Sequence, residues 1–167
     1  MSPNRRHSGV AFTLAEALLA SAVLAMAITA ITMPFTAAAQ NDQVNARRTV
    51  AEALAQEMME EILAKPFADP QGATVPGPER GETSRNLFDN VDDYDGYVET
   101  DGNIADAGGA PLDDPPAAGL SRHVWAAYVY IDGQSPADPP TFVRVVVDVR
   151  YLGQPIVTLS RLVYDLR

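Results

Sequence analysis

The sequence predicts an α+β fold in which a long N-terminal helix packs on a small antiparallel sheet. Three observations lead to this prediction. An uncharged apolar stretch near the N-terminus runs into an amphipathic helical pattern, a Pro/Gly-rich acidic segment follows, and the last third alternates apolar and polar residues. A helix and a sheet with one apolar face each bury those faces against one another. With 167 residues, the chain has room for one globular domain besides the helix.

The N-terminal part predicts a membrane-spanning helix. After a basic segment, residues 1–11, the chain carries no charge except Glu16 until Asp42. Residues 12–39 are apolar on all faces and exceed the roughly 20 residues that a spanning helix needs. The arginines of the basic segment place residues 40–167 outside the cytoplasm by the positive-inside rule. We expect a bend or local melting at Pro34, because proline removes a helical hydrogen bond.

Glu16 is the first candidate functional residue. A charge at the centre of a bilayer costs about 2.5–3.5 kcal/mol on insertion scales, so a carboxylate in such a segment indicates function. The nearest basic side chain, Arg6, lies ten residues back. The alternative is that the Glu16 carboxylate only reaches out to the lipid headgroups.

Residues 40–65 predict the second, amphipathic half of the same helix. Charged residues appear here, and apolar residues recur at helical spacing. These apolar residues are Val44, Ala51, Leu54, Met58 and Ile62. The helix should end at Lys65, because Pro66 disfavours helix at the preceding residue.

Residues 66–120 form an acidic Pro/Gly-rich loop region by composition, with 7 prolines, 8 glycines and 12 acidic residues. Such a segment cannot bury a core of its own. We expect short strands or turns at 86–91 and 96–100, and partial disorder around 102–116.

Residues 121–167 predict an antiparallel sheet with strands at 123–132, 141–152 and 156–166. In the middle strand Val143, Val145, Val147, Val149 and Tyr151 share one face. We expect this face to pack on Leu54, Met58 and Ile62 of the helix.

The last two predicted strands are joined by a turn at 153–155. In the final strand we expect one face to be formed by Ile156, Leu162, Tyr164 and Leu166.

The N-terminal motif resembles that of the type IV pilin family, which includes the pseudopilins of type II secretion systems. In that family a basic leader is cut before a Phe, and a Glu follows four residues later; here Phe12 and Glu16 match, while Ala11 replaces the usual Gly. The resemblance implies cleavage between Ala11 and Phe12 by prepilin peptidase and N-methylation of Phe12. It also implies that Glu16 neutralises a subunit amine during assembly, and that the fold is pilin-like.

Residues 53–60 resemble the end of the first helix in I-type minor pseudopilins and V-type minor pilins. The resemblance implies a structural subunit of a type II secretion pseudopilus or type IV pilus, and not an enzyme. Its partners would be other pilin or pseudopilin subunits, the inner-membrane assembly platform and the lipid bilayer. The chain would be a single-pass inner-membrane protein with a periplasmic C-terminal domain before it enters the filament.

The alternative is a secreted or membrane-anchored module with an ordinary signal sequence. Residues 37–39 form an A-x-A cleavage site before Gln40. Against it, a signal peptide has an apolar region of about 7–15 residues, which the stretch here exceeds.

Composition argues against several other functions. A net charge of −10 argues against nucleic-acid binding, and the absence of cysteine excludes thiolate sites. The only histidines are His7 and His123, and no G-x-S-x-G motif accompanies them. We expect no cofactor.

The acidic run 89–97 is a candidate calcium loop through Asp92, Asp93 and Asp95. Its match to the loop pattern D-x-[DN]-x-[DN]-G lacks the first aspartate and the glutamate at position 12. A solvated acidic loop without metal is therefore the favoured interpretation.

Overall fold

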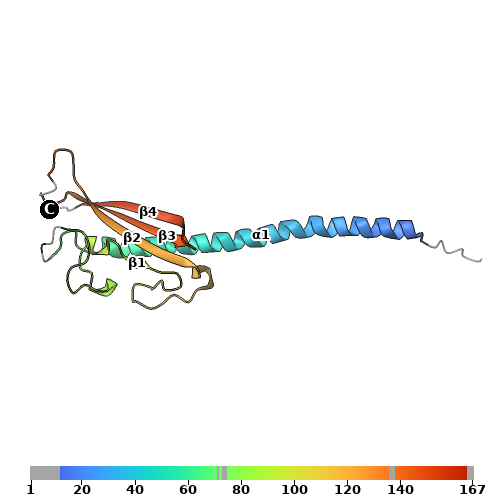
Figure 1. Cartoon of the computed structure of the whole chain (residues 1–167), viewed down its shortest axis with the longest axis horizontal. Coiled ribbons are helices and arrows are strands. Elements are labelled where there is room, and N and C mark those ends of the chain that lie inside the picture. Colours follow the sequence, from blue (N-terminus) through green and yellow to red (C-terminus); the bar gives the residue numbers. More distant parts are fainter. Residues whose placement is uncertain (1–11, 71, 73–74, 136–137, 165–167) are drawn as a thin grey trace, which may run out of the picture. The chain divides into compact units, whose positions relative to one another are not determined.

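The structure has the α+β architecture that the sequence predicts: one long helix and one antiparallel sheet (Figure 1). It is a computed structural model that describes residues 12–70, 72, 75–135 and 138–164. The chain divides into two compact units, Met1–Gln43 and Val44–Arg167. The helix α1, Leu14–Leu63, runs through the boundary between them.

The helix α1 is continuous through Pro34, so of the predicted bend or local melting, the melting is wrong. It ends two residues before Lys65, close to the predicted end, and Ala64 and Lys65 still donate to carbonyls of the last turn. The first half of α1 exposes its apolar side chains, and this helix is long and apolar enough to cross a membrane.

The sheet is a four-stranded meander in the order β1-β2-β3-β4, and every neighbouring pair is antiparallel. The strands are β1 (Val98–Glu99), β2 (Leu120–Val129), β3 (Phe142–Tyr151) and β4 (Gln154–Tyr164). The predicted meander of three strands is confirmed, with β1 added at its edge. Because β2 begins at Leu120, His123 lies inside the strand and not at its start as predicted.

The predicted face of the last strand is wrong. A register shift after Val149 leaves Ile156 as an extra residue, because Val149 pairs with Val157 while Arg150 pairs with Pro155. Beyond this bulge the odd-numbered residues of β4 therefore face the core. These are Val157, Leu159 and Val163.

The residues predicted to share one face of β4 divide between its two sides: Ile156 packs against the core, whereas Leu162 and Tyr164 lie on the outer side. Leu162 and Tyr164 are 49% and 55% exposed. Leu166, predicted to share their face, lies outside the described residues. The predicted turn at 153–155 is displaced by one residue, since Leu152 and Gly153 form it with φ of 47° and 80°. Two positive φ angles are typical of the type I′ hairpin turn.

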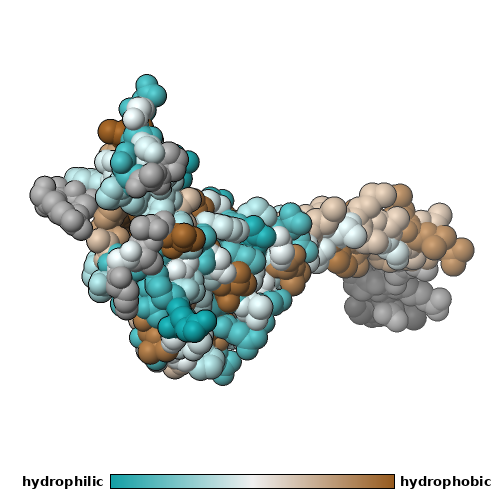
Figure 2. Space-filling model, turned by 60° about the vertical axis from the view of Figure 1, so that its left-hand side comes forward, coloured by the Kyte–Doolittle hydropathy of each residue, from teal (hydrophilic) through white to brown (hydrophobic). Residues whose placement is uncertain are grey.

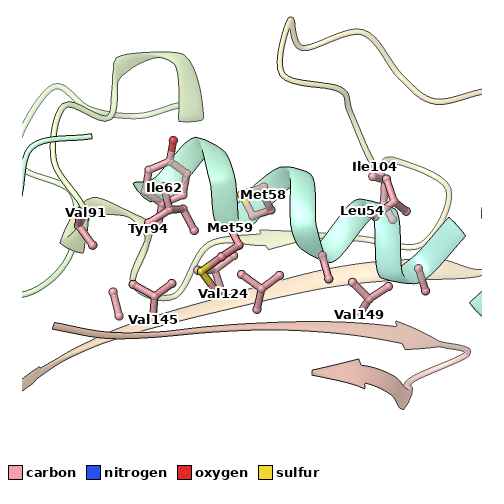
Figure 3. Packing of buried hydrophobic residues seen from close by; sticks show 14 of the residues in the cluster. Leu54, Met58, Met59, Ile62, Val91, Tyr94, Ile104, Val124, Val145 and Val149 are labelled. Atoms are coloured by element: carbon pink, nitrogen blue, oxygen red, sulfur yellow. The ribbon is translucent and has the colours of Figure 1, made fainter. Parts of the chain in front are cut away.

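The core forms between the second half of α1 and the valine face of β3, as predicted (Figure 3). All four valines of that face are buried. The helix contributes Ala51, Leu54, Ala55, Met58, Met59 and Ile62. Val44 was predicted to belong to this stripe but is 57% exposed.

The region 66–120 also contributes to this core, which its composition did not indicate. It folds into three short 3-10 helices, η1 (Arg85–Leu87), η2 (Asp92–Tyr94) and η3 (Pro115–Ala117), besides β1. Its buried apolar side chains are Phe88, Val91, Tyr94, Ile104 and Ala117.

Three segments of this region, 86–91, 96–100 and 102–116, can be compared with their predicted structure. Of the short strands or turns expected at 86–91 and 96–100, the second is the strand β1, and the first includes most of the 3-10 turn η1. Expected disorder around 102–116 is contradicted by a bridge between Ala105 and Pro111 and by the buried side chain of Ile104. The segment is ordered because Ile104 anchors it to the core.

We expect Met58→Asp to destabilise the folded unit by several kcal/mol, because the substitution buries an unpaired charge in an apolar core. The measurement is thermal unfolding of the full-length protein in detergent, followed by the fluorescence of Trp125, the single tryptophan. Val44→Asp on the same helix is the matched control and should leave the melting temperature within about 2 °C of wild type, as exposed substitutions usually do. Equal effects of the two substitutions would contradict the assigned helix face.

Candidate functional site

The start of α1 is held by a local cap. The backbone N–H of Glu16 donates to Thr13 Oγ1 at 3.2 Å, and Ala17 N–H donates to the Thr13 carbonyl at 3.1 Å. Thr13 thus acts as N-cap with Glu16 at the third helical position, the spacing of a capping box. This structural role was not predicted from the sequence, although the pattern Thr-x-x-Glu indicates it. Phe12 is 80% exposed just before the cap, while Ala11 lies outside the described residues.

Glu16 lies along an apolar groove on the first part of α1. The groove is lined by Glu16, Leu19, Ala20, Val23, Leu24 and Ala27. The carboxylate stands in the first helical turn, where the helix dipole favours negative charge. Alanines at positions 20 and 27 leave room for another helix to approach closely. Figure 2 shows the mostly hydrophobic surface of this part of the helix.

The hydroxyl groups in the apolar half of α1 are bonded within the helix. Ser21 donates to the Ala17 carbonyl at 2.8 Å, and Thr29, Thr32 and Thr36 donate to carbonyls three and four residues back. Side-chain donors satisfied in this way require no water. The first half of α1 therefore suits a solvent that offers no hydrogen bonds.

A buried network of four charged side chains lies in the folded unit. Arg122 on β2 is fully buried, and its Nε donates to Glu99 Oε2 at 2.6 Å. Its Nη1 and Nη2 donate to the carbonyls of Leu54 and Ala105 at 3.0 and 2.9 Å. Arg122 thereby ties β2 to α1, to β1 and to the segment after β1.

Arg85 extends the network to the end of α1. Its Nη1 donates to Glu99 Oε1 at 3.1 Å, and its Nε and Nη2 donate to both oxygens of Glu61. Tyr94 donates to Glu61 Oε1 at 2.7 Å, and Tyr97 donates to Glu99 Oε1 at 3.1 Å. Every carboxylate in the network therefore has an arginine and a tyrosine as donors.

The charge state of Glu61 follows from these contacts. Burial alone would raise the pKa of Glu61, but hydrogen bonds from Arg85 and Tyr94 hold the pKa below its ordinary value. The ionised form is therefore the one that the network stabilises. The contacts of the network join α1, β1 and β2, which is a structural role.

The three aspartates of the calcium candidate have separate partners. Asp92 Oδ2 accepts from Tyr128 at 2.9 Å, and Asp95 Oδ1 accepts from Ala126 N–H at 3.0 Å. Asp93 Oδ2 accepts from the N–H groups of residues 89 and 90 at 2.7 and 3.0 Å. The structure thus uses these carboxylates to hold the acidic segment to β2 and to form a local turn.

Asp93 instead meets two carboxylates that the sequence pattern did not single out. Glu79, Glu82 and Asp93 each place one oxygen within 4.8 Å of the others. Burial, a hydrogen bond to Glu82 and nearby acidic side chains raise the pKa of Glu79 to about 8. Burial also raises the pKa of Asp93 and brings that of Asp92 to about 6. Negative charge is therefore unfavourable here.

His123 forms part of an aromatic surface on β2. Its ring stacks on Trp125 with centroids 5.9 Å apart, and the guanidinium of Arg150 lies 5.7 Å from the Trp125 ring centroid. Burial and the positive charge of Arg150 lower the pKa of His123. No described contact gives His123 a nucleophile to activate.

Comparison of the chain with family models, with curated proteins and with solved structures found no match.

We expect Glu99→Gln to destabilise the folded unit by about 3–5 kcal/mol, because it leaves the buried Arg122 and the partly buried Arg85 without their shared carboxylate. Glu52→Gln is the matched control, since Glu52 pairs with Arg48 at 3.1 Å on the exposed side of α1. Exposed pairs contribute about 0–1 kcal/mol, so the control should unfold close to wild type. Urea unfolding measures both; comparable losses would refute a special role for the buried network.

Proposed function

We propose that this chain is a minor pilin or pseudopilin, a structural subunit that assembles through its N-terminal helix. The observation that carries the proposal is the composition of α1. Its first half exposes apolar side chains on all sides, and its second half buries one face under a four-stranded sheet. A soluble protein has no use for such an exposed apolar half, whereas a membrane-stored filament subunit needs it first in lipid and then against other helices.

The charged group at the start of this helix supports the same proposal. Glu16 follows Phe12 by four positions, and Phe12 lies just before the start of α1. Cleavage before Phe12 would create an amine, which is a cation where water is scarce. A carboxylate and an amine attract strongly in such surroundings. Glu16 would then compensate the Phe12 amine of its own chain or of a neighbour, and would fix the axial register of stacked helices.

The capping contact of Thr13 is compatible with this role. The bond to Thr13 uses the backbone N–H of Glu16, not its carboxylate. No described hydrogen bond or ion pair occupies the carboxylate of Glu16. The local cap therefore leaves the charge available for a subunit amine.

The resemblance of residues 53–60 to minor subunits concerns core packing. Leu54, Ala55, Met58 and Met59 from this stretch are all buried under the sheet. Glu57 instead accepts a hydrogen bond from Ala107 N–H at 3.2 Å, which holds the segment after β1 to the helix. These contacts support a pilin-like domain around the second half of α1.

Mass spectrometry of the N-terminal peptide from native membranes tests the proposal. We expect the mature chain to start at Phe12 with one methyl group on its amine. Ala39→Asp is a sharp control, because it removes the A-x-A site of an ordinary signal peptidase and should leave processing before Phe12 unchanged. If the wild-type chain starts at Gln40 and the Ala39→Asp variant does not, the protein is secreted after ordinary signal cleavage and the proposal is wrong. A chain that still starts at Met1 would indicate a plain membrane anchor.

A further inference from the structure

Three carboxylates from two chain segments converge beside the sheet. Asp93 belongs to η2, while Glu79 and Glu82 lie on a turn in the preceding segment. Gly77 N–H donates to the Asp92 carbonyl at 3.0 Å and holds the two segments together. One oxygen of each carboxylate lies within 4.8 Å of the others.

Two oxygens of this cluster are buried without a donor. Asp93 is 0% exposed; its Oδ2 accepts two backbone N–H groups, whereas its Oδ1 has no hydrogen-bond partner among the described residues. Glu79 Oε2 is likewise closed to solvent and without a partner in the described part of the chain. A buried carboxylate oxygen without a donor is strongly unfavourable. Each oxygen therefore needs a cation, a hydrogen-bond donor or a proton.

The described protein groups do not supply this partner. The ion pairs among the described residues involve the acids Glu52, Glu61, Glu99 and Asp148, and none from the cluster. The ammonium of Lys65 donates to the Phe88 carbonyl at 2.5 Å. We propose that Glu79, Glu82 and Asp93 bind one calcium ion.

The donor set and its dimensions favour calcium over other metals. Only carboxylates converge, and hard oxygen donors of this kind select calcium or magnesium over zinc or copper. Two ligands at about 2.3–2.6 Å on opposite sides of calcium are about 5 Å apart, which accommodates oxygens spread over as much as 4.8 Å. Magnesium usually keeps several waters and is bound through one or two carboxylates, so three converging carboxylates favour calcium.

This site differs from the calcium loop considered from the sequence, which consisted of Asp92, Asp93 and Asp95. The two sites share only Asp93. The ion would join the 79–82 turn to η2, and η2 is already fixed to β2 through the bond from Tyr128 to Asp92. The inference depends on residues 77–93 alone. It therefore stands or falls independently of processing at Phe12.

The experiment uses the full-length protein in detergent, stripped of metal with a chelator and then titrated with calcium chloride. We expect saturable binding of one calcium per chain by calorimetry. With calcium in about hundredfold excess over its dissociation constant, the melting temperature followed at Trp125 should rise by about 5–10 °C. Magnesium at the same concentration should give less than half of this shift.

Two ligand variants and a matched control complete the test. Glu79→Gln and Glu82→Gln each remove a repelling charge, so without calcium they should melt at or above the wild-type temperature. Each should weaken calcium binding at least about tenfold, while Asp113→Asn, an exposed acid outside the cluster, should bind like wild type.

Three results would overturn the site. The first is a wild-type melting temperature that calcium does not change, as expected if the carboxyl groups share a proton instead. The second is a rise in melting temperature with calcium that both glutamine variants retain. The third is an equal rise in the melting temperature of wild type with magnesium, which would indicate general charge screening. The calorimetric result for wild type decides the question even if a variant fails to fold.

Discussion

Arg122 is the residue on which the arrangement of the folded unit most depends. It occupies a core-facing position of β2 between Leu120 and Val124, and it is fully buried. A guanidinium in that position is tolerated only with complete pairing, which Glu99 and the carbonyls of Leu54 and Ala105 provide. Through these bonds one side chain sets where α1, β1 and the following segment lie against the sheet. Glu99 also pairs with Arg85, and Arg85 in turn pairs with Glu61 near the end of α1.

The sequence predicted the elements whose pattern is local. Strict alternation identified the valine face of β3, and helical spacing identified Leu54, Met58 and Ile62 as its partners. The face of β4 was mispredicted because a bulge at Ile156 reverses the alternation, and the one local sign of it, Pro155, is also common at turns and strand starts. The buried charge network was missed because its members are far apart in the chain and because Arg122 lies before the predicted start of its strand.

The acidic region shows how composition can mislead about structure. Twelve acidic residues and seven prolines predict a solvated loop, yet several of these acids have buried structural partners. Glu99 pairs with arginines, Asp92 accepts from Tyr128, and Asp95 accepts from β2. In the cluster of Glu79, Glu82 and Asp93, two buried oxygens, Glu79 Oε2 and Asp93 Oδ1, lack a donor among the described residues, and this contrast is the basis for assigning the cluster a cation. Three-dimensional proximity, not spacing in the sequence, distinguishes the two groups.

The proposed assembly through the first half of α1 is tested most directly by site-specific crosslinking, because the chain has no cysteine of its own. Cysteine at Ala20 or Ala27, on the groove beside Glu16, should crosslink to a companion pilin-like subunit in native membranes. The same crosslinks should be lost when Glu16→Ala is added, since the register of the helices would no longer be fixed. Crosslinks that arise only from cysteine at Ala107, in the exposed acidic region, would contradict the account and make that region the binding surface.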